Sequence, residues 1–262
     1  MEQVFDRRAV RLHRDRAAAS VTQVEDVLRN AAERLLDRLD DTTVRFTQAL
    51  DVGGRGVVAP LLRARGIGVV SCDLSPRMAA VNGGACVAAD EERLPFAPGA
   101  FDLVVANLAL HWINDLPGAL IQLRLTLRPG GLLLASVPVL GTLATLRAAL
   151  TQAEAALSGG ASPRVSPFPE LRDLAGLMQR AGFELPVVDA EEIMLSYADP
   201  STLLADLRAA GETNAVALRA RRFLRAALVP MALGGMAMQD GRLPVVLRVG
   251  TLTGWAGRSV QA

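Results

Sequence analysis

Acidic and amide side chains that could hold a ribose-containing ligand follow four apolar runs in the first half of the chain. They are Asp51, Asp73, Asp90 and Asn107. Apolar runs without alternation are typical of strands buried on both faces of a parallel sheet, and ligands bind outside the carboxyl ends of such strands. We therefore expect these four side chains to meet at one edge of a sheet and to face one ligand.

A glycine turn follows the first of these runs. Gly53, Gly54 and Gly56 permit a sharp turn at positive φ and let a ligand approach the main chain closely. The apolar pattern predicts a strand over 44–52 before the turn and a helix over 57–65 after it. A strand, a tight turn and a helix N-terminus together make a pocket for a nucleotide-like ligand.

Two cofactors compete for this pocket. Residues 54–59 fit the dinucleotide fingerprint, with Asp73 about 20 residues further on. S-adenosylmethionine (SAM) fits the same positions, because its ribose hydroxyls need a carboxylate after the second strand and its methionine amine needs an acidic neighbour such as Asp51. A dinucleotide would bring its pyrophosphate close to Asp51, where two negative groups repel each other. The residues favour SAM and leave an NAD-dependent oxidoreductase as an alternative.

The composition excludes several classes of chemistry. The chain has 262 residues and a formal net charge of +1, which suits one domain and gives no overall attraction to nucleic acid or to an anionic membrane. It contains no lysine, so a P-loop lysine, a Schiff base and an SxxK nucleophile are excluded. The histidines are His13 and His111, and no CxxC or HExxH motif occurs, so we expect no metal site.

The sequence predicts a cytoplasmic protein without an integral membrane segment. The most apolar long stretch, 130–146, is interrupted by Pro138 and Gly141. Acidic residues among the N-terminal arginines argue against a targeting peptide. We expect Cys72 and Cys86 to be buried thiols in a reducing compartment.

Strands and helices are expected to alternate in an α/β, Rossmann-like, doubly wound, mainly parallel seven-stranded sheet. The strands are predicted over 44–52, 68–72, 85–89, 101–108, 132–137, 184–197 and 243–252, the last as an antiparallel partner at the sheet edge. The helices are predicted over 5–38, 57–65, 75–82, 116–127, 143–157, 169–181 and 201–210. A single domain would then comprise an N-terminal helical extension (1–42), a SAM-binding core (43–140) and an acceptor or lid part with helical insertions (141–262).

Four motifs follow one another between residues 89 and 131. They are Ala-Asp-Glu-Glu-Arg-Leu-Pro-Phe (89–96), Phe-Asp-Leu-Val-Val-Ala-Asn-Leu (101–108), Leu-His-Trp (110–112) and Leu-Arg-Pro-Gly-Gly (127–131). Together they resemble the motifs of class I SAM-dependent methyltransferases of the type 11 group. The resemblance implies SAM as cofactor and S-adenosylhomocysteine as its product. It implies cofactor binding by Asp51, Gly53, Gly54, Gly56, Asp73, Leu74, Asp90, Glu91 and Asn107, with Asp73 on the ribose and Asp90 near the adenine.

A second set of motifs covers nearly the whole chain. It comprises Phe5-Asp6-Arg7, the run His111 to Pro117, Ser162 to Phe168, Arg180 to Phe183, Gly211 to Asn214, and Gly254-Trp255. This set resembles the methyltransferase-like assembly factors of respiratory complex I, and the LPF, HW and AGF patterns also resemble the malonyl-carrier-protein O-methyltransferase of biotin synthesis. The mitochondrial assembly factor is associated with hydroxylation of an arginine in a complex I subunit, so the fold alone does not decide the reaction.

The resemblance implies two functions and shows one departure. The first function is methyl transfer from SAM to an undetermined acceptor, and the second is assembly of complex I by a protein that binds SAM and a subunit polypeptide. The family's glycine turn reads Asp-Leu-Gly-Cys-Gly-x-Gly, whereas this chain has Asp-Val-Gly-Gly-Arg-Gly, one residue shorter. Since three glycines remain, we expect SAM to bind with an altered pose of its methionine part.

The acceptor is expected to enter beside His111. This histidine is the candidate general base, and a structural wall beside Trp112 is the other interpretation. The N-terminal helix is either a cap over the pocket or a helix packed on the sheet edge. With 159–168, these elements would form a mouth whose glycines and prolines suit a movable lid and a polypeptide acceptor.

Overall fold

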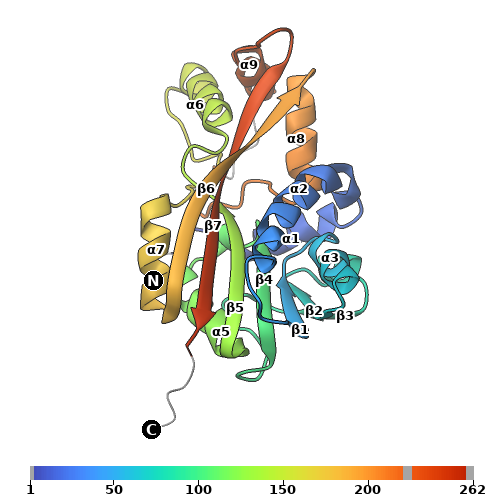
Figure 1. Ribbon diagram of the computed structural model, residues 1–262. Coiled ribbons are helices and arrows are strands. Elements are labelled where there is room, and N and C mark those ends of the chain that lie inside the picture. Colours follow the sequence, from blue (N-terminus) through green and yellow to red (C-terminus); the bar gives the residue numbers. More distant parts are fainter. Residues whose placement is uncertain (1–2, 221–225, 258–262) are drawn as a thin grey trace.

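One seven-stranded sheet organises the computed structural model, which describes residues 3–220 and 226–257 (Figure 1). The strands are β1 (Gln48–Val52), β2 (Gly68–Asp73), β3 (Ala85–Ala88), β4 (Phe101–Asn107), β5 (Leu127–Pro138), β6 (Phe183–Tyr197) and β7 (Leu243–Ala256). Their order is β3-β2-β1-β4-β5-β7-β6. The first five strands run parallel, and β7 is antiparallel to both β5 and β6. The prediction of a mainly parallel, seven-stranded sheet is confirmed.

Helices and short 3-10 turns connect the strands in the described part of the chain. The α-helices are α1 (Arg7–Ala17), α2 (Glu25–Leu36), α3 (Val58–Ala64), α4 (Pro76–Val81), α5 (Leu116–Thr126), α6 (Ala144–Ser158), α7 (Leu171–Arg180), α8 (Pro200–Ala209) and α9 (Leu228–Gly234). The 3-10 helices are η1 (Val21–Val24), η2 (Asp37–Leu39) and η3 (Leu110–Trp112).

The helices bury both faces of the central strands. On one face α2 and α3 pack Leu35 and Leu62 against the strands, and on the other α5 and α7 pack Leu120 and Met178. Burial of both faces explains why the parallel strands read as continuous apolar runs. The polar side chains that could serve a ligand therefore lie at the strand ends.

A smaller lobe lies over the carboxyl edge of the parallel strands. It is made of α6, α8 and α9 with the adjoining ends of β6 and β7, at the top of Figure 1. Its core includes Leu146, Leu203, Leu228 and Val245. Because this lobe comes from residues after 140, the late part of the chain covers the edge where the strand-end side chains lie.

Two predicted elements differ from the structure in more than the position of their ends. The helix predicted over 5–38 is broken by a turn at 18–20 into α1 and α2, with η1 between them. Strand β7 is antiparallel as predicted, but it lies between β5 and β6 instead of at the sheet edge. The edge position belongs to β6.

Local chemistry explains other agreements and differences. Ser75 caps α4, since its Oγ accepts the Met78 N–H at 3.0 Å. Helix α8, predicted to begin at 201, begins at Pro200 and is capped by Asp199, which accepts the Ser201 N–H. Cys72 is buried as expected, but Cys86 is exposed because β3 is a four-residue strand at the sheet edge.

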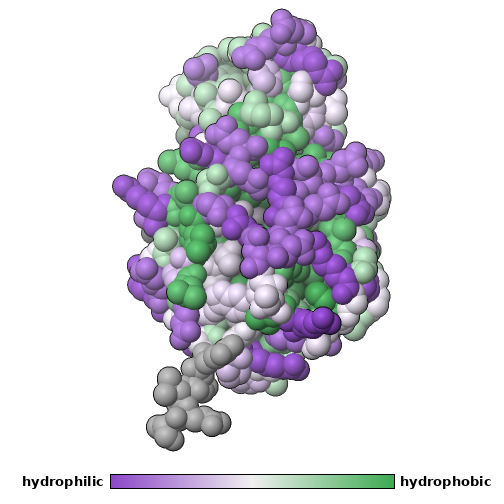
Figure 2. Space-filling view, in the orientation of Figure 1, coloured by the Kyte–Doolittle hydropathy of each residue, from purple (hydrophilic) through white to green (hydrophobic). Residues whose placement is uncertain are grey.

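The surface carries apolar residues on the outer strand. Figure 2 shows apolar colour on the side where β6 and α7 lie, and Leu185 and Val187 of β6 are 78% and 51% exposed. Among the described helices, none is long and apolar enough to cross a membrane.

Candidate functional site

The glycine turn and the strand-end carboxylates lie together at the carboxyl edge of the sheet. Asp51 of β1 pairs in register with Ser71 of β2 and Val105 of β4, and Asp73 ends β2. Asp51 and Asp73 are fully buried. The parallel register thus brings together residues that are about 20 positions apart in the sequence.

The turn after β1 has no room for larger side chains. Gly53 and Gly56 have φ of 64° and 87°, a region that side chains rarely adopt. A Cβ at Gly54 would lie 2.2 Å from Asp51 Oδ1. The glycines therefore let the main chain fold closely around the Asp51 carboxylate.

Asp51 is the strongest sign of a missing partner at this edge. Its Oδ1 is buried without a hydrogen-bond partner, while its Oδ2 accepts the Ser71 hydroxyl at 3.2 Å. Burial raises the pKa of the Asp51 carboxyl to about 7. A buried carboxyl with one unpaired oxygen beside a glycine turn fits a ligand that carries a cationic amine, as the methionine part of SAM does.

Asp51 is also expected to make stability depend on pH. The folded protein keeps the Asp51 proton up to about pH 7, whereas the unfolded chain loses it near 3.8. The folded state thus binds more protons in this interval, so the free energy of unfolding falls by about 4 kcal/mol as pH rises from about 4 to about 7. Urea unfolding at several pH values should show this loss in the wild type and a flatter profile in Asp51→Asn. Equal slopes for the two proteins would contradict the raised pKa.

The other predicted carboxylates are paired with arginines of α1. Asp73 Oδ2 accepts a hydrogen bond from Arg14 Nη1 at 2.8 Å. Asp90 accepts one from Arg7 Nη2 at 2.6 Å, and Glu91 accepts one from the same nitrogen. The sequence placed these carboxylates at the edge correctly, but it did not indicate their partners.

Asn107 and Leu74 lie beside the same edge. The Asn107 amide donates to the Leu28 carbonyl at 3.0 Å and accepts the Ser136 hydroxyl at 2.9 Å. It therefore joins α2 to β5, and its side chain has a structural task besides any contact with a ligand. Leu74 is partly buried against the apolar cluster of Phe5 and Trp112.

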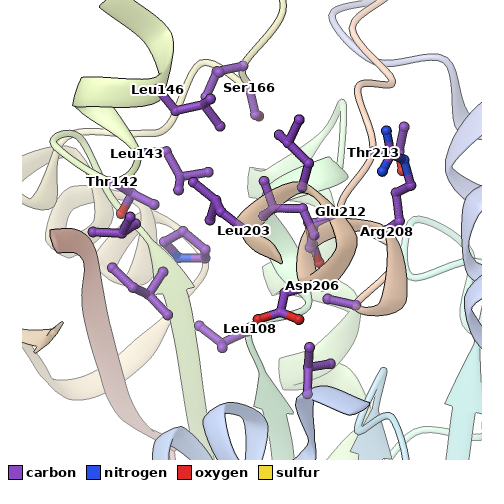
Figure 3. Close-up of a pocket in the computed structure, with 18 of the residues that line it drawn as sticks. Leu108, Thr142, Leu143, Leu146, Ser166, Leu203, Asp206, Arg208, Glu212 and Thr213 are labelled. Carbon is purple, nitrogen blue, oxygen red and sulfur yellow. The ribbon is translucent and has the colours of Figure 1, made fainter. Parts of the chain in front are cut away.

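A cavity of about 250 Å³ lies between the glycine turn and the smaller lobe (Figure 3). Its walls are mainly apolar and include Leu108, Leu143, Leu146, Val165, Phe168 and Leu203. Its charged and polar members include Arg55, His111, Glu212, Asp206 and Tyr197. The cavity is bordered by η1, by η3 and by 164–168, the segments expected to form the acceptor's mouth.

Glu212 holds His111 at the wall of this cavity. Its Oε2 lies 2.6 Å from His111 Nε2 and accepts the Trp112 indole N–H at 2.7 Å, while its Oε1 accepts from Arg55 at 2.8 Å. Burial alone raises the pKa of a carboxyl, but His111 and Arg55 hold the pKa of Glu212 below its usual range. His111 Nδ1 is buried without a partner. A carboxylate on one ring nitrogen and an open position on the other is the arrangement of a general base fixed in one tautomer.

Backbone strain concentrates around the cavity. Arg55, Leu108 and Leu143 line it and have φ of 50°, 49° and 54°, values that cost energy for residues other than glycine. Arg55 is 3% exposed, and its guanidinium donates to the Leu108 carbonyl and to the Ala210 carbonyl at 3.2 Å. The shortened turn therefore sends an arginine into the protein and joins the glycine turn to the cavity.

A second carboxylate, Asp206 of α8, lines the cavity. Figure 3 shows its carboxylate among the apolar side chains. It accepts a hydrogen bond from Tyr197, and burial, followed by the charge of Asp206, raises the pKa of the tyrosine. The cavity thus offers a negative group within a mainly apolar wall.

Sequence reasoning missed Glu212 and Arg14 as members of the site. Glu212 lies in a motif noted only for its resemblance, 101 positions from His111, and no local pattern joins the two. Arg14 did have a local signal, since Val10, Arg14 and Ala17 follow helical spacing and all three are buried. An arginine on an apolar helix face indicates a buried partner.

Comparisons with known proteins agree with this geometry. A model of the methyltransferase domain matches residues 22–187. The mitochondrial arginine-hydroxylase NDUFAF5 of Danio rerio is 34% identical over 273 residues, covering 99% of this chain and 84% of that protein. The malonyl-[acyl-carrier protein] O-methyltransferase of Halorhodospira halophila is 35% identical and covers 94% of this chain and 87% of that protein. The solved structure of YcgJ from Bacillus subtilis has a TM-score of 0.60 at 13% identity and covers 87% of this chain and 99% of that one.

Proposed function

The chain belongs to the class I SAM-dependent methyltransferases, and from its site we propose that it transfers a methyl group from SAM to an acceptor held in the cavity beside His111. The observation that supports this most is the Glu212–His111 pair at the wall of a cavity that Arg55 joins to the glycine turn. The site combines a cofactor edge, an acceptor space with mainly apolar walls and a basic group, His111, at its wall.

The cofactor edge has the chemistry that SAM requires. Asp51 offers an unpaired carboxyl oxygen for the ammonium group, Asp73 a carboxylate for the ribose, and Asp90 with Glu91 acceptors for the adenine side. The glycine turn leaves the main chain open to a ligand. When bound, SAM supplies a methyl group that is already activated on a sulfonium. The protein's task is then mainly alignment, which is worth roughly 7–11 kcal/mol.

The cavity favours an acceptor with an apolar body and one reactive polar end. Leucine and valine walls would bury the body, and His111 Nδ1 would accept the proton that an oxygen or nitrogen acceptor releases. Glu212 holds the Nε2 position and stabilises the imidazolium that forms. The mainly apolar walls shield one side of the reacting atoms from water during transfer.

Hydroxylation of an arginine in a protein subunit, a step that consumes dioxygen and two electrons from a reductant, is a second candidate. It is favoured by Asp206, because a carboxylate in an apolar wall suits a guanidinium, and by the similarity to arginine-hydroxylase NDUFAF5. A subunit of a respiratory complex is the partner in this candidate. The free cysteines among the described residues suit a reducing compartment, so a cytoplasmic location is part of the proposal.

Mass spectrometry of acceptors incubated with the purified protein and SAM tests the proposal. Cell extract, a malonyl carrier protein and arginine-containing subunit peptides should be offered separately, each with and without dioxygen and an electron donor. A methyl group gained by one acceptor, with S-adenosylhomocysteine formed in equal amount, is the expected result. Gain of an oxygen atom on an arginine would favour the second candidate, and neither product in any mixture would contradict both.

A further inference from the structure

Two arginines of α1 lie on the carboxylates of the proposed cofactor edge. Arg14 pairs with Asp73, and their side chains are 2% and 0% exposed. Arg7 pairs with Asp90 and Glu91. Residues seven positions apart project from one face of a helix. One face of α1 therefore supplies cations to both the ribose and the adenine positions.

Arg14 fills the gap between the glycine turn and Asp73. A Cβ placed on Gly53 would lie 3.2 Å from Arg14 Nη1, 3.8 Å from Asp73 Oδ2 and 2.8 Å from the Ala109 side chain. The guanidinium is thus within contact distance of the turn on one side and bonded to the carboxylate on the other. A ligand that uses both the turn and Asp73 must pass through this space.

The arginine and a ribose compete for the same acceptors. Asp73 Oδ1 already accepts the Ser75 N–H at 2.8 Å, and its Oδ2 accepts from Arg14. Ribose hydroxyls bind a carboxylate by donating hydrogen bonds, as a guanidinium does. Because Asp73 is fully buried, no free oxygen faces solvent. Each carboxylate oxygen can accept a second hydrogen bond, but the buried Arg14 guanidinium covers Oδ2, so a ribose reaches Asp73 only when Arg14 moves.

Helix α1 is held mainly by polar contacts. Its buried apolar residues are Ala9, Val10 and Ala17, all small. A turn at 18–20 separates it from η1 and α2, so α1 has a hinge at one end. Near its other end Phe5 packs on Trp112, and release of α1 requires this contact and the ion pairs to break.

We propose that α1 is a latch that closes the cofactor cleft with Arg14 and Arg7, and that SAM binds only after these arginines release Asp73 and Glu91. The inference rests on the proposed cofactor site. The latch keeps the buried carboxylates paired while the cleft is closed. Cofactor binding then has two steps, in which α1 opens before SAM contacts the carboxylates. Because only the open fraction of molecules can bind, the apparent affinity for SAM is lower than that of the open form.

Calorimetry with S-adenosylhomocysteine tests the competition. Arg14→Gln and Arg7→Gln should each bind it about tenfold more tightly than the wild type, because the competing charge-assisted bond is removed. Arg11→Gln is the matched control, since Arg11 is 55% exposed on the same helix, and its affinity should equal that of the wild type. Unchanged or weaker binding in both test variants would overturn the latch.

Stopped-flow tryptophan fluorescence, compared between the wild type and Arg7→Gln, tests the order of events. Phe5, just before α1, packs edge-on against Trp112 with ring centroids 5.3 Å apart, so release of the helix should change the indole signal. The observed rate in the wild type should level off at high S-adenosylhomocysteine concentration, and Arg7→Gln should raise that plateau. A rate that rises linearly in both proteins overturns the latch alone. Absence of binding in every variant overturns the cofactor assignment with it.

Discussion

Replacing Asp73 by alanine is expected to destabilise the protein by about 3–5 kcal/mol, because it leaves the buried Arg14 cation without its partner. Urea unfolding measures this loss. Asp189→Ala is the matched control, since Asp189 is 45% exposed and pairs with Arg38 at the surface. Its cost should stay under about 1 kcal/mol.

Asp73→Ala alone cannot separate a loss of cofactor contact from a loss of stability. A protein weakened by an unpaired arginine would lose affinity through its fold as well as through the lost ribose contact. The double variant with Arg14→Gln removes both charges and should recover most of the lost stability. If Asp73→Ala costs no more than the Asp189 control, the ion pair between α1 and β2 is not the buried contact described here.

Replacing His111 by asparagine is expected to lower methyl transfer by about 10²–10⁴-fold while leaving S-adenosylhomocysteine affinity unchanged, since a general base contributes in this range. Glu212→Gln should reduce turnover in the same direction because it removes the negative charge that stabilises the imidazolium. Steady-state kinetics on the identified acceptor, with calorimetry alongside, separates turnover from binding.

A control for the cavity wall completes this experiment. Tyr197→Phe removes a polar group on the Asp206 side without touching Glu212, and its turnover should stay within a few-fold of the wild type. Full activity in His111→Asn would assign the histidine to the structural role considered as its alternative. Loss of cooperative unfolding in that variant would point the same way.

The sheet core was predictable because its signals are local. Apolar runs and the strand-end carboxylates depend on neighbouring residues, so β1 to β5 were all found, with ends shifted by up to five residues. The exchange of β6 and β7 at the edge was not predictable, since periodicity gives the existence of a strand and not its place in the sheet. The exposure of Cys86 was missed for the same reason, because only the order of strands in the sheet shows that β3 is an edge strand.

The charged partners of the site were beyond sequence reasoning for a related reason. Glu212 reaches His111 only because the loop after α8 folds back over η3. The short turn buries Arg55 with positive φ at the wall of the cavity. Ion pairs between residues far apart in the sequence follow no periodic pattern, so only the folded structure identifies them.

Transfer of a deuterated methyl group is the most direct measurement of methyl transfer at this site. The wild type, His111→Asn and an unrelated surface variant, Arg172→Gln, should be incubated with methyl-deuterated SAM and cell extract, and labelled products identified by mass spectrometry. We predict a labelled methyl group on one acceptor with the wild type and Arg172→Gln, and a strongly reduced amount with His111→Asn. An acceptor that gains oxygen and no labelled methyl, or label transferred equally by all three proteins, would contradict methyl transfer assisted by His111.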